Sequence, residues 1–305
     1  MATVREIRRR IKSVKNIAQV TRAMQAVSAS KMRRAQEAVL ATRPYAQRAW
    51  MLLTHLAAQH GEQEEMHPLL QVRPVSKVAL VLLTGDRGLC GAFNTNIIRK
   101  ALDYIEVLPV PVDVVAVGRK GRNVMLRQGR ALVAEFSDLP PQPTLADVSP
   151  IARVALEGFL DGSYDAVWLA YTDFINTLRQ EPVVKRLLPL TPTEMEKQVM
   201  AEHVEEATTE TVEVPEYIYE PDPRTILKSV VPRFTELQVY QAVLESIASE
   251  HSARMVAMRN ATENAEALTD DLQLTYNKAR QRAITREIVD IASGAEALVQ
   301  ARAAR

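Results

Sequence analysis

The sequence predicts an α+β protein in which a long antiparallel coiled coil, made of the N- and C-terminal helices, carries a central α/β domain. Two observations predict the helices. Residues 1–43 contain neither proline nor glycine, and residues 233–305 contain no proline and only one glycine, Gly294. The third observation predicts the domain, because every other glycine lies between these ends among short apolar runs. Each end can therefore form one very long helix.

The composition indicates a protein with a hydrophobic core and much helix. Of the 305 residues 47% are hydrophobic and 25% charged, and the net charge is +1. Aromatic residues make up only 5%, which is typical of long helices rich in Ala, Glu, Arg and Leu. The single cysteine, Cys90, excludes an internal disulfide and indicates a reducing compartment. No apolar stretch approaches the ~20 residues of a membrane span, and no signal peptide is recognisable, so we expect membrane association only through a partner.

The N-terminal segment is basic. Residues 1–34 contain ten Lys and Arg against one acid, Glu6, whereas residues 194–222 contain ten Asp and Glu against one Lys. Three interpretations of the basic segment are open: an acidic protein partner, the solvated flank of a coiled coil, or nucleic acid. Nucleic acid is disfavoured, because no aromatic side chain that could stack on a base precedes Tyr45.

We expect four segments along the chain: an N-terminal coiled-coil helix at 1–60, an α/β domain at 74–192, an acidic linker or insertion at 193–222, and a C-terminal coiled-coil helix at 223–305. In the first, apolar residues recur at steps of three and four from Val4, and Thr3 with Glu6 predicts a capping box. Pro44 either kinks this helix or begins a second one.

The central segment alternates apolar strands with helices. We expect strands at 78–83, 112–117 and 166–171, and helices at about 94–107, after Gly118, and at about 145–160. This order predicts a small, mostly parallel, Rossmann-like sheet. We expect the acidic segment after it to be a surface segment with solvated charges.

The C-terminal helix is expected to be longer than its partner. At ~1.5 Å per residue the N-terminal helix is about 80 Å long and the C-terminal helix about 115 Å. If they pair antiparallel, roughly the last 20 residues extend past the partner by about 30 Å. Such a lone helix is unstable in water unless other proteins surround it.

We find no residues in the pattern of a catalytic, cofactor or metal site. Gly85, Gly88 and Gly91 follow a strand, but their spacing fits neither phosphate-binding fingerprint, so a tight turn is the preferred interpretation. The five histidines lack metal-ligand spacing, and we expect His251 to be a packed helix residue. Cys90 has no evident base nearby and is expected to be a small turn residue.

Several long motifs resemble those of the F-type ATP synthase gamma subunit, in its bacterial form. They cover nearly the whole chain in the order of that family, at residues 7–17, 21–24, 29–32, 86–91 with Asn94, 217–223, 249–258 and 272–285. The paired cysteines of the chloroplast regulatory insertion are absent, so we expect no thiol regulation. The helix motif begins within ten residues of Met1, so we expect no organelle transit peptide.

The resemblance implies a central rotor shaft that couples proton-driven rotation to ATP synthesis or hydrolysis at the beta subunits and is itself non-catalytic. It implies alpha, beta and epsilon subunits and the membrane ring of c subunits as partners, and a peripheral place on the cytoplasmic side of the cell membrane. By motif match Met24 and Arg254 face the beta subunits, with Gln281 and Thr285 further along the coupling region. Arg8 and Arg9 are candidate contacts to acidic beta loops on charge alone.

Two other classes remain open. A coiled-coil nucleic-acid-binding protein predicts steeply salt-dependent binding of DNA or RNA by the N-terminal segment. A nucleotide-dependent α/β enzyme predicts stoichiometric nucleotide binding by the isolated chain. The rotor interpretation predicts neither.

Overall fold

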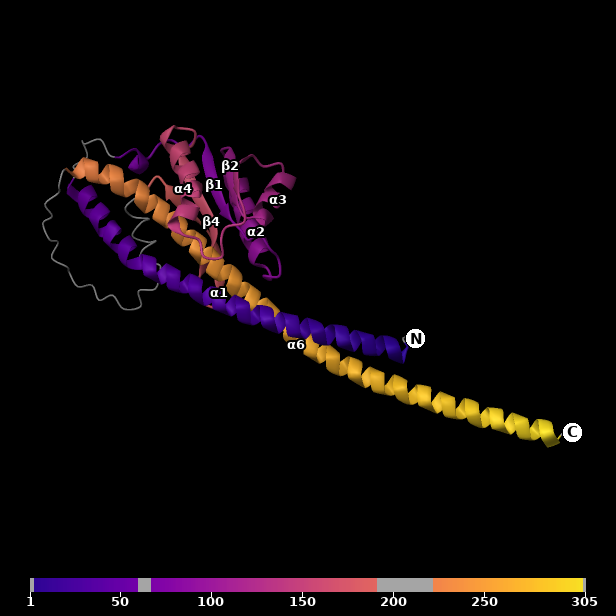
Figure 1. Ribbon diagram of the computed structural model, residues 1–305. Helices are drawn as coiled ribbons and strands as arrows, with labels where there is room; N and C mark the ends of the chain where they lie inside the picture. Colours follow the sequence, from indigo (N-terminus) through magenta and orange to yellow (C-terminus); the bar gives the residue numbers. More distant parts are fainter. Residues whose placement is uncertain (1–2, 60–66, 191–221, 304–305) are drawn as a thin grey trace. The chain divides into compact units, whose positions relative to one another are not determined.

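The computed structural model describes residues 3–59, 67–190 and 222–303 (Figure 1). The chain forms two compact units. The first unit consists of Met1–Val27 and Met255–Arg305, and the second of Ser28–Arg254. Two long helices, α1 (Val4–Gln59) and α6 (Pro223–Ala303), each contribute to both units. The expected acidic segment at 193–222 lies outside the described residues except for its last position.

Helix α1 begins with the predicted capping box. The backbone N–H of Thr3 donates to Glu6 Oε2 at 3.0 Å, and that of Glu6 donates to Thr3 Oγ1 at 3.3 Å. Pro44 lies inside the helix, so the chain neither stops nor restarts there. Of the two alternatives for this proline, a second helix is therefore excluded.

Helix α6 begins at Pro223. It also contains Pro232, the last proline of the chain, nine residues further on. Asp222 supplies the cap, because its Oδ1 accepts from the N–H of Thr225 at 2.9 Å. Proline suits the first helical position, where the missing N–H has no intrahelical partner. The helix thus begins at the first residue of the expected segment 223–305.

The second unit contains a five-stranded sheet in the order β3-β2-β1-β4-β5. The strands are β1 (Val78–Leu83), β2 (Val112–Val117), β3 (Leu132–Phe136), β4 (Ala166–Phe174) and β5 (Gln180–Leu188). β1 to β4 are parallel, and β5 is antiparallel to β4. The mostly parallel sheet is confirmed, but two edge strands were missed. β3 alternates half-buried and exposed residues, and β5 carries Pro182 with several charged residues, so neither has a buried apolar run.

Helices cover both faces of this sheet. The strand β1 is buried along its whole length, and its residues alternate between two cores. One core contains Ala79, Val81 and Leu83 with α4 (Leu145–Leu160) and part of α6. The other contains Leu80 and Leu82 with α2 (Phe93–Val107) and α3 (Arg119–Arg127). A short 3-10 helix, η1 (Pro68–Leu70), adds the fully buried Leu69 to the first core.

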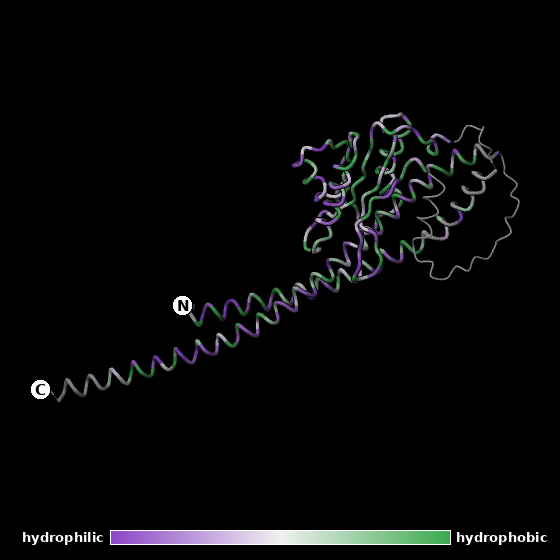
Figure 2. Tube along the Cα trace, turned by 180° about the vertical axis from the view of Figure 1, so that it is seen from behind, coloured by the Kyte–Doolittle hydropathy of each residue, from purple (hydrophilic) through white to green (hydrophobic). Residues whose placement is uncertain are grey.

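The helices α1 and α6 pair antiparallel in each unit. Thr21 lies opposite Thr262 in the first unit, and Thr42 accepts a hydrogen bond from Gln241 in the second. Each of these contacts joins a residue early in the chain to one late in it, as antiparallel pairing within each unit requires. Hydrophobic residues, green in Figure 2, recur along these helices between hydrophilic stretches. In the part of the chain that the structure describes, no helix is long and apolar enough to cross a membrane.

Candidate functional site

The seam of the first unit is narrow and partly polar. Ile7 and Ile11 of α1 are buried, but further along the seam the buried residues are Thr21 with Met258, Thr262, Ala265 and Thr269. The Oγ1 atoms of Thr21 and Thr262 lie 2.7 Å apart. Small side chains let the helix backbones approach closely, and the hydroxyls match each other across the contact.

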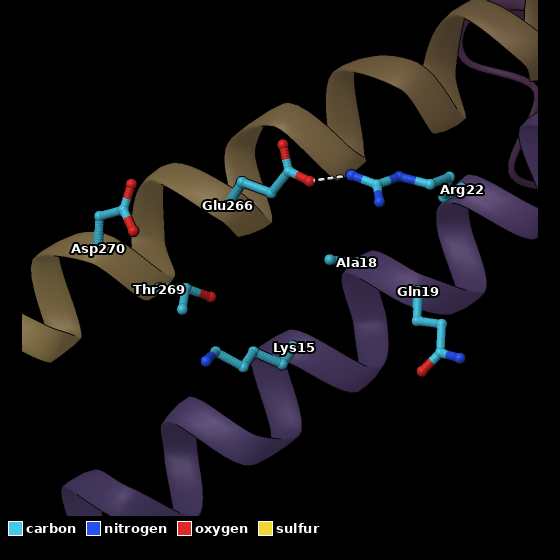
Figure 3. Close-up of a pocket in the computed structure, with 7 residues that line it drawn as sticks. All are labelled: Lys15, Ala18, Gln19, Arg22, Glu266, Thr269 and Asp270. Atoms are coloured by element: carbon cyan, nitrogen blue, oxygen red, sulfur yellow. Dashed lines mark hydrogen bonds and ion pairs between the residues drawn. The ribbon is translucent and has the colours of Figure 1, made fainter.

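Beside this seam lies a groove of about 320 Å³ between the two helices (Figure 3). It is lined by Lys15, Ala18, Gln19, Arg22, Glu266, Thr269 and Asp270. An ion pair between Arg22 and Glu266 spans it. Two cations and two carboxylates balance, so the charge of the groove selects neither an anion nor a cation.

The C-terminal end of α6 extends past the start of α1. The register of the first unit places Val4 opposite Ala279, and every residue from 280 to 295 is exposed. On this end Ile284, Ile288 and Ile291 are 48%, 61% and 68% exposed at helical spacing. The predicted lone helical end is therefore confirmed, and it carries an apolar stripe that nothing in the described chain covers.

Most of the residues predicted to contact other subunits lie in the first unit. Arg8 and Arg9 are exposed on α1, and Gln281 and Thr285 are exposed on the lone end of α6. Met24 is half-buried at the helix pair. Exposure is what an intermolecular contact requires, but the contacts themselves stay predictions.

Arg254 belongs to the second unit and is only 9% exposed. Its guanidinium forms an ion pair with Glu250 one turn earlier. It also donates to the carbonyl of Gly88 at 3.3 Å and lies 3.1 Å from Nδ1 of His251. These partners join α6 to the turn after β1. Contact of Arg254 with another subunit stays a prediction.

Sequence reasoning missed Glu250. A glutamate four residues before an arginine on a helix is the spacing of a favourable ion pair, and that signal was available. The spacing did not reveal where the ion pair lies, because the turn that Arg254 contacts is more than 150 residues away in the sequence.

His251 and Cys90 are packed residues near Arg254. Burial, and then the cations of Arg254 and Lys31, lower the pKa of His251 to about 4, so the imidazole is neutral at pH 7. Burial raises the pKa of the Cys90 thiol. Within residues 3–59, 67–190 and 222–303, no three His, Cys, Asp or Glu side chains are grouped so as to hold a metal ion.

Comparison with known proteins decides the family. The profile of the family described as ATP synthase matches residues 3–298. The ATP synthase gamma chain of Roseiflexus castenholzii is 50% identical over 306 residues, which cover 98% of this chain and 100% of the relative. The chain belongs to the ATP synthase gamma chain family. Gamma chains of Chloroflexus aurantiacus and Dehalococcoides mccartyi are 50% and 48% identical, each over 98% of this chain and at least 99% of the relative.

Solved structures share the fold of this gamma-family chain. A chain from the central stalk and c-ring of the Tetrahymena thermophila mitochondrial ATP synthase has a TM-score of 0.56 and 24% identity, over 79% of this chain and 99% of that one. A chain from the rotor of the Euglena gracilis mitochondrial ATP synthase has a TM-score of 0.60 and 20% identity, over 92% and 98%. The predicted combination of long terminal helices and a mixed α/β sheet is thus the fold of known rotor chains.

Proposed function

We propose that this chain is the central rotor shaft of an F-type ATP synthase, which couples proton-driven rotation to ATP synthesis or hydrolysis at the beta subunits. The observation that carries the proposal is the helix pair of unequal length. Its lone end exposes Ile284, Ile288 and Ile291 over the stretch where none of the described residues pairs with α6. An apolar stripe on an unpaired helix indicates a surface that other proteins enclose.

An asymmetric shaft suits this task for a physical reason. Inside a ring of three alternating alpha–beta pairs, a helix pair cannot contact all three beta subunits alike. Each orientation of the shaft therefore stabilises a different set of open and closed nucleotide sites. By thermodynamic reciprocity, nucleotide binding and release bias the angle of the shaft.

The side chains along the shaft divide into two kinds of proposed contact. Met24, Gln281 and Thr285 are uncharged, so their contacts to the beta subunits would add no ion pair that holds the shaft at one angle. Arg8 and Arg9 add positive charge near the start of α1, where acidic loops of the beta subunits would be attracted. Arg254 completes the proposed set of coupling residues.

The proposal makes the chain a non-catalytic subunit. Its partners are the alpha and beta subunits, the epsilon subunit and the ring of c subunits, and it needs neither a nucleic acid nor a cofactor. It reaches the membrane only through these partners, as a peripheral protein on the cytoplasmic side of the cell membrane.

Co-purification tests the proposal most directly. The chain, tagged and co-expressed with alpha and beta subunits, is expected in one copy per hexamer of three alpha and three beta subunits. A chain that stays monomeric beside assembled alpha and beta subunits contradicts the proposal. Stoichiometric nucleotide binding by the isolated chain would instead support an α/β enzyme, and steeply salt-dependent DNA or RNA binding would support a nucleic-acid-binding protein.

A further inference from the structure

The sheet of the second unit has the crevice at which doubly wound α/β domains bind a ligand. From β1 the chain proceeds outward to β2 and β3, and it then returns to β4 on the other side of β1. The strand order thus reverses between β1 and β4. In open α/β sheets ligands bind at such a switch point, outside the carboxyl ends of the strands. Here those ends are the residues after Leu83 in β1 and the last residues of β4.

Helix α6 occupies this crevice. On the β4 side, Ser249 Oγ donates to the carbonyl of Thr172 at 3.1 Å. On the β1 side, a Cβ placed on Gly85 would lie 2.8 Å from Glu250 Cδ and 2.9 Å from each carboxylate oxygen. The Glu250 side chain therefore lies directly against the backbone of the turn that follows β1. A side chain at Gly85 would force the Glu250 carboxylate to move.

The crevice holds an anion together with its cation. The side chains of Glu250 and Arg254 are only 17% and 11% exposed, and they form an ion pair. Arg254 also donates to Gly88 O at 3.3 Å, so the pair is bonded to the turn as well as to the helix. A bound phosphate or carboxylate ligand would place the same combination of charges at this position.

We infer that the Glu250 carboxylate is an internal ligand of the α/β domain, and that with Arg254 it attaches the domain to α6 so that torque passes between them. The transfer of torque rests on the proposed function, but the occupation of the crevice by Glu250 does not depend on that function. Because the Glu250 carboxylate fills the crevice, the domain needs no external ligand there, although its topology is that of ligand-binding domains. Glu250 is thus a positioning residue, since it acts through the turn and through Arg254.

The only cysteine of the chain reports on this crevice. Cys90 is 2% exposed and lies in the same turn, where Asn94 Nδ2 donates to its sulfur at 3.1 Å. In the full-length chain, Glu250→Ala is expected to speed labelling of Cys90 by a small thiol reagent about tenfold, because the lost charge-assisted hydrogen bonds set the local opening equilibrium. Glu250→Gln removes the same charge but keeps the side-chain volume, so both variants change the ionisation of the Cys90 thiol alike. If the Ala variant is labelled faster than the Gln variant, the difference therefore measures opening of the crevice.

Two further comparisons sharpen this test. Acetate restores a carboxylate of the size that Glu250→Ala removes, and it should slow labelling of that variant toward the wild-type rate. Glu263→Ala is the matched control, because Glu263 forms an i,i+4 pair with Arg259 on the same helix but is 59% exposed. It should leave the labelling rate within about twofold of the wild type. Equal labelling of the wild type and Glu250→Ala overturns the inference.

Gly85 supplies a second test, in which a side chain is added to the turn instead of being removed from the helix. Gly85→Ala should speed labelling because its Cβ collides with the Glu250 carboxylate, and it should have no further effect when Glu250 is already Ala. At Gly88 a Cβ would meet nothing within 4 Å, so Gly88→Ala should label within about twofold of the wild type. Additive effects of Gly85→Ala and Glu250→Ala would overturn the proposed contact.

Torque transfer is tested in the assembled complex. With alpha, beta and the membrane sector present, Glu250→Ala should lower the number of protons pumped per ATP hydrolysed, and acetate should raise it again. An unchanged ratio in the fully assembled complex overturns the torque part of the inference. Failure of the wild-type chain to assemble would instead overturn the proposed function, and the labelling comparison would still decide whether Glu250 fills the crevice.

Discussion

Thr21 and Thr262 meet across the helix pair of the first unit, with their Oγ1 atoms 2.7 Å apart and both residues buried. Thr21 Oγ1 also lies 3.1 Å from the carbonyl of Ala18, and Thr262 Oγ1 lies 2.9 Å from that of Met258. A buried polar pair across the seam favours one register, because a shift of either helix would separate the two hydroxyls. The pair therefore specifies how far α6 extends past α1.

Replacing one of these threonines should destabilise the chain more than replacing both. Thr21→Val or Thr262→Val alone should lower the free energy of unfolding by about 1 kcal/mol, because the remaining hydroxyl loses one partner. The double variant should be less destabilised than the two singles together, since two valines of the same shape pack against each other. Guanidinium unfolding followed by circular dichroism measures this, and strictly additive losses would contradict it.

Met24→Lys should reduce coupling more than assembly. A cation at this half-buried position of the shaft would create an attraction to the surrounding subunits that depends on the angle of rotation. Protons pumped per ATP hydrolysed should fall, while the complex still purifies intact. Met24→Leu is the control, because it keeps the volume without a charge. An unchanged ratio in the intact Lys variant defeats the prediction.

The lone end of α6 should matter for assembly and not for the stability of the chain. Ile288 is 61% exposed, so Ile288→Ser should change the free energy of unfolding of the isolated chain by less than about 0.5 kcal/mol. The same change removes apolar surface that the alpha and beta subunits would cover, and it should lower the yield of co-purified hexamer. Ile288→Leu should assemble like the wild type, and equal yields for Ser and Leu would refute the prediction.

His251 should make the chain sensitive to acid. Its pKa is lowered to about 4 in the folded chain and is close to 6.5 when unfolded, so between these values the unfolded state binds more protons. Stability is therefore expected to fall as the pH drops from about 6.5 toward 4, by at most about 3 kcal/mol. His251→Gln cannot take up a proton and should show a shallower loss over this window. Unfolding curves at several pH values for both chains provide the comparison, and parallel pH profiles would show that His251 is not responsible.

The long helices could be predicted from the sequence because their determinants are local. The absence of helix breakers in residues 1–43, the recurrence of apolar residues from Val4, and the capping box at Thr3 all operate within a few residues. The central strands β1 and β2 were equally evident, since β1 is a continuous apolar run that is buried throughout, and β2 is apolar apart from Asp113, with its last four residues buried. The edge strands β3 and β5 were not, because an edge strand needs only one apolar face and tolerates charge and proline.

What the sequence by itself determined is the pair of unequal helices, including the end of α6 that extends past α1, because helix length follows from local propensity and a constant rise per residue. Only the tertiary structure decided what fills the crevice of the sheet. Gly85 and Glu250 are far apart in the sequence, and no local pattern links a glycine turn to a glutamate on a distant helix. Their contact arises because the sheet and α6 pack together, so its chemistry is a property of the folded chain.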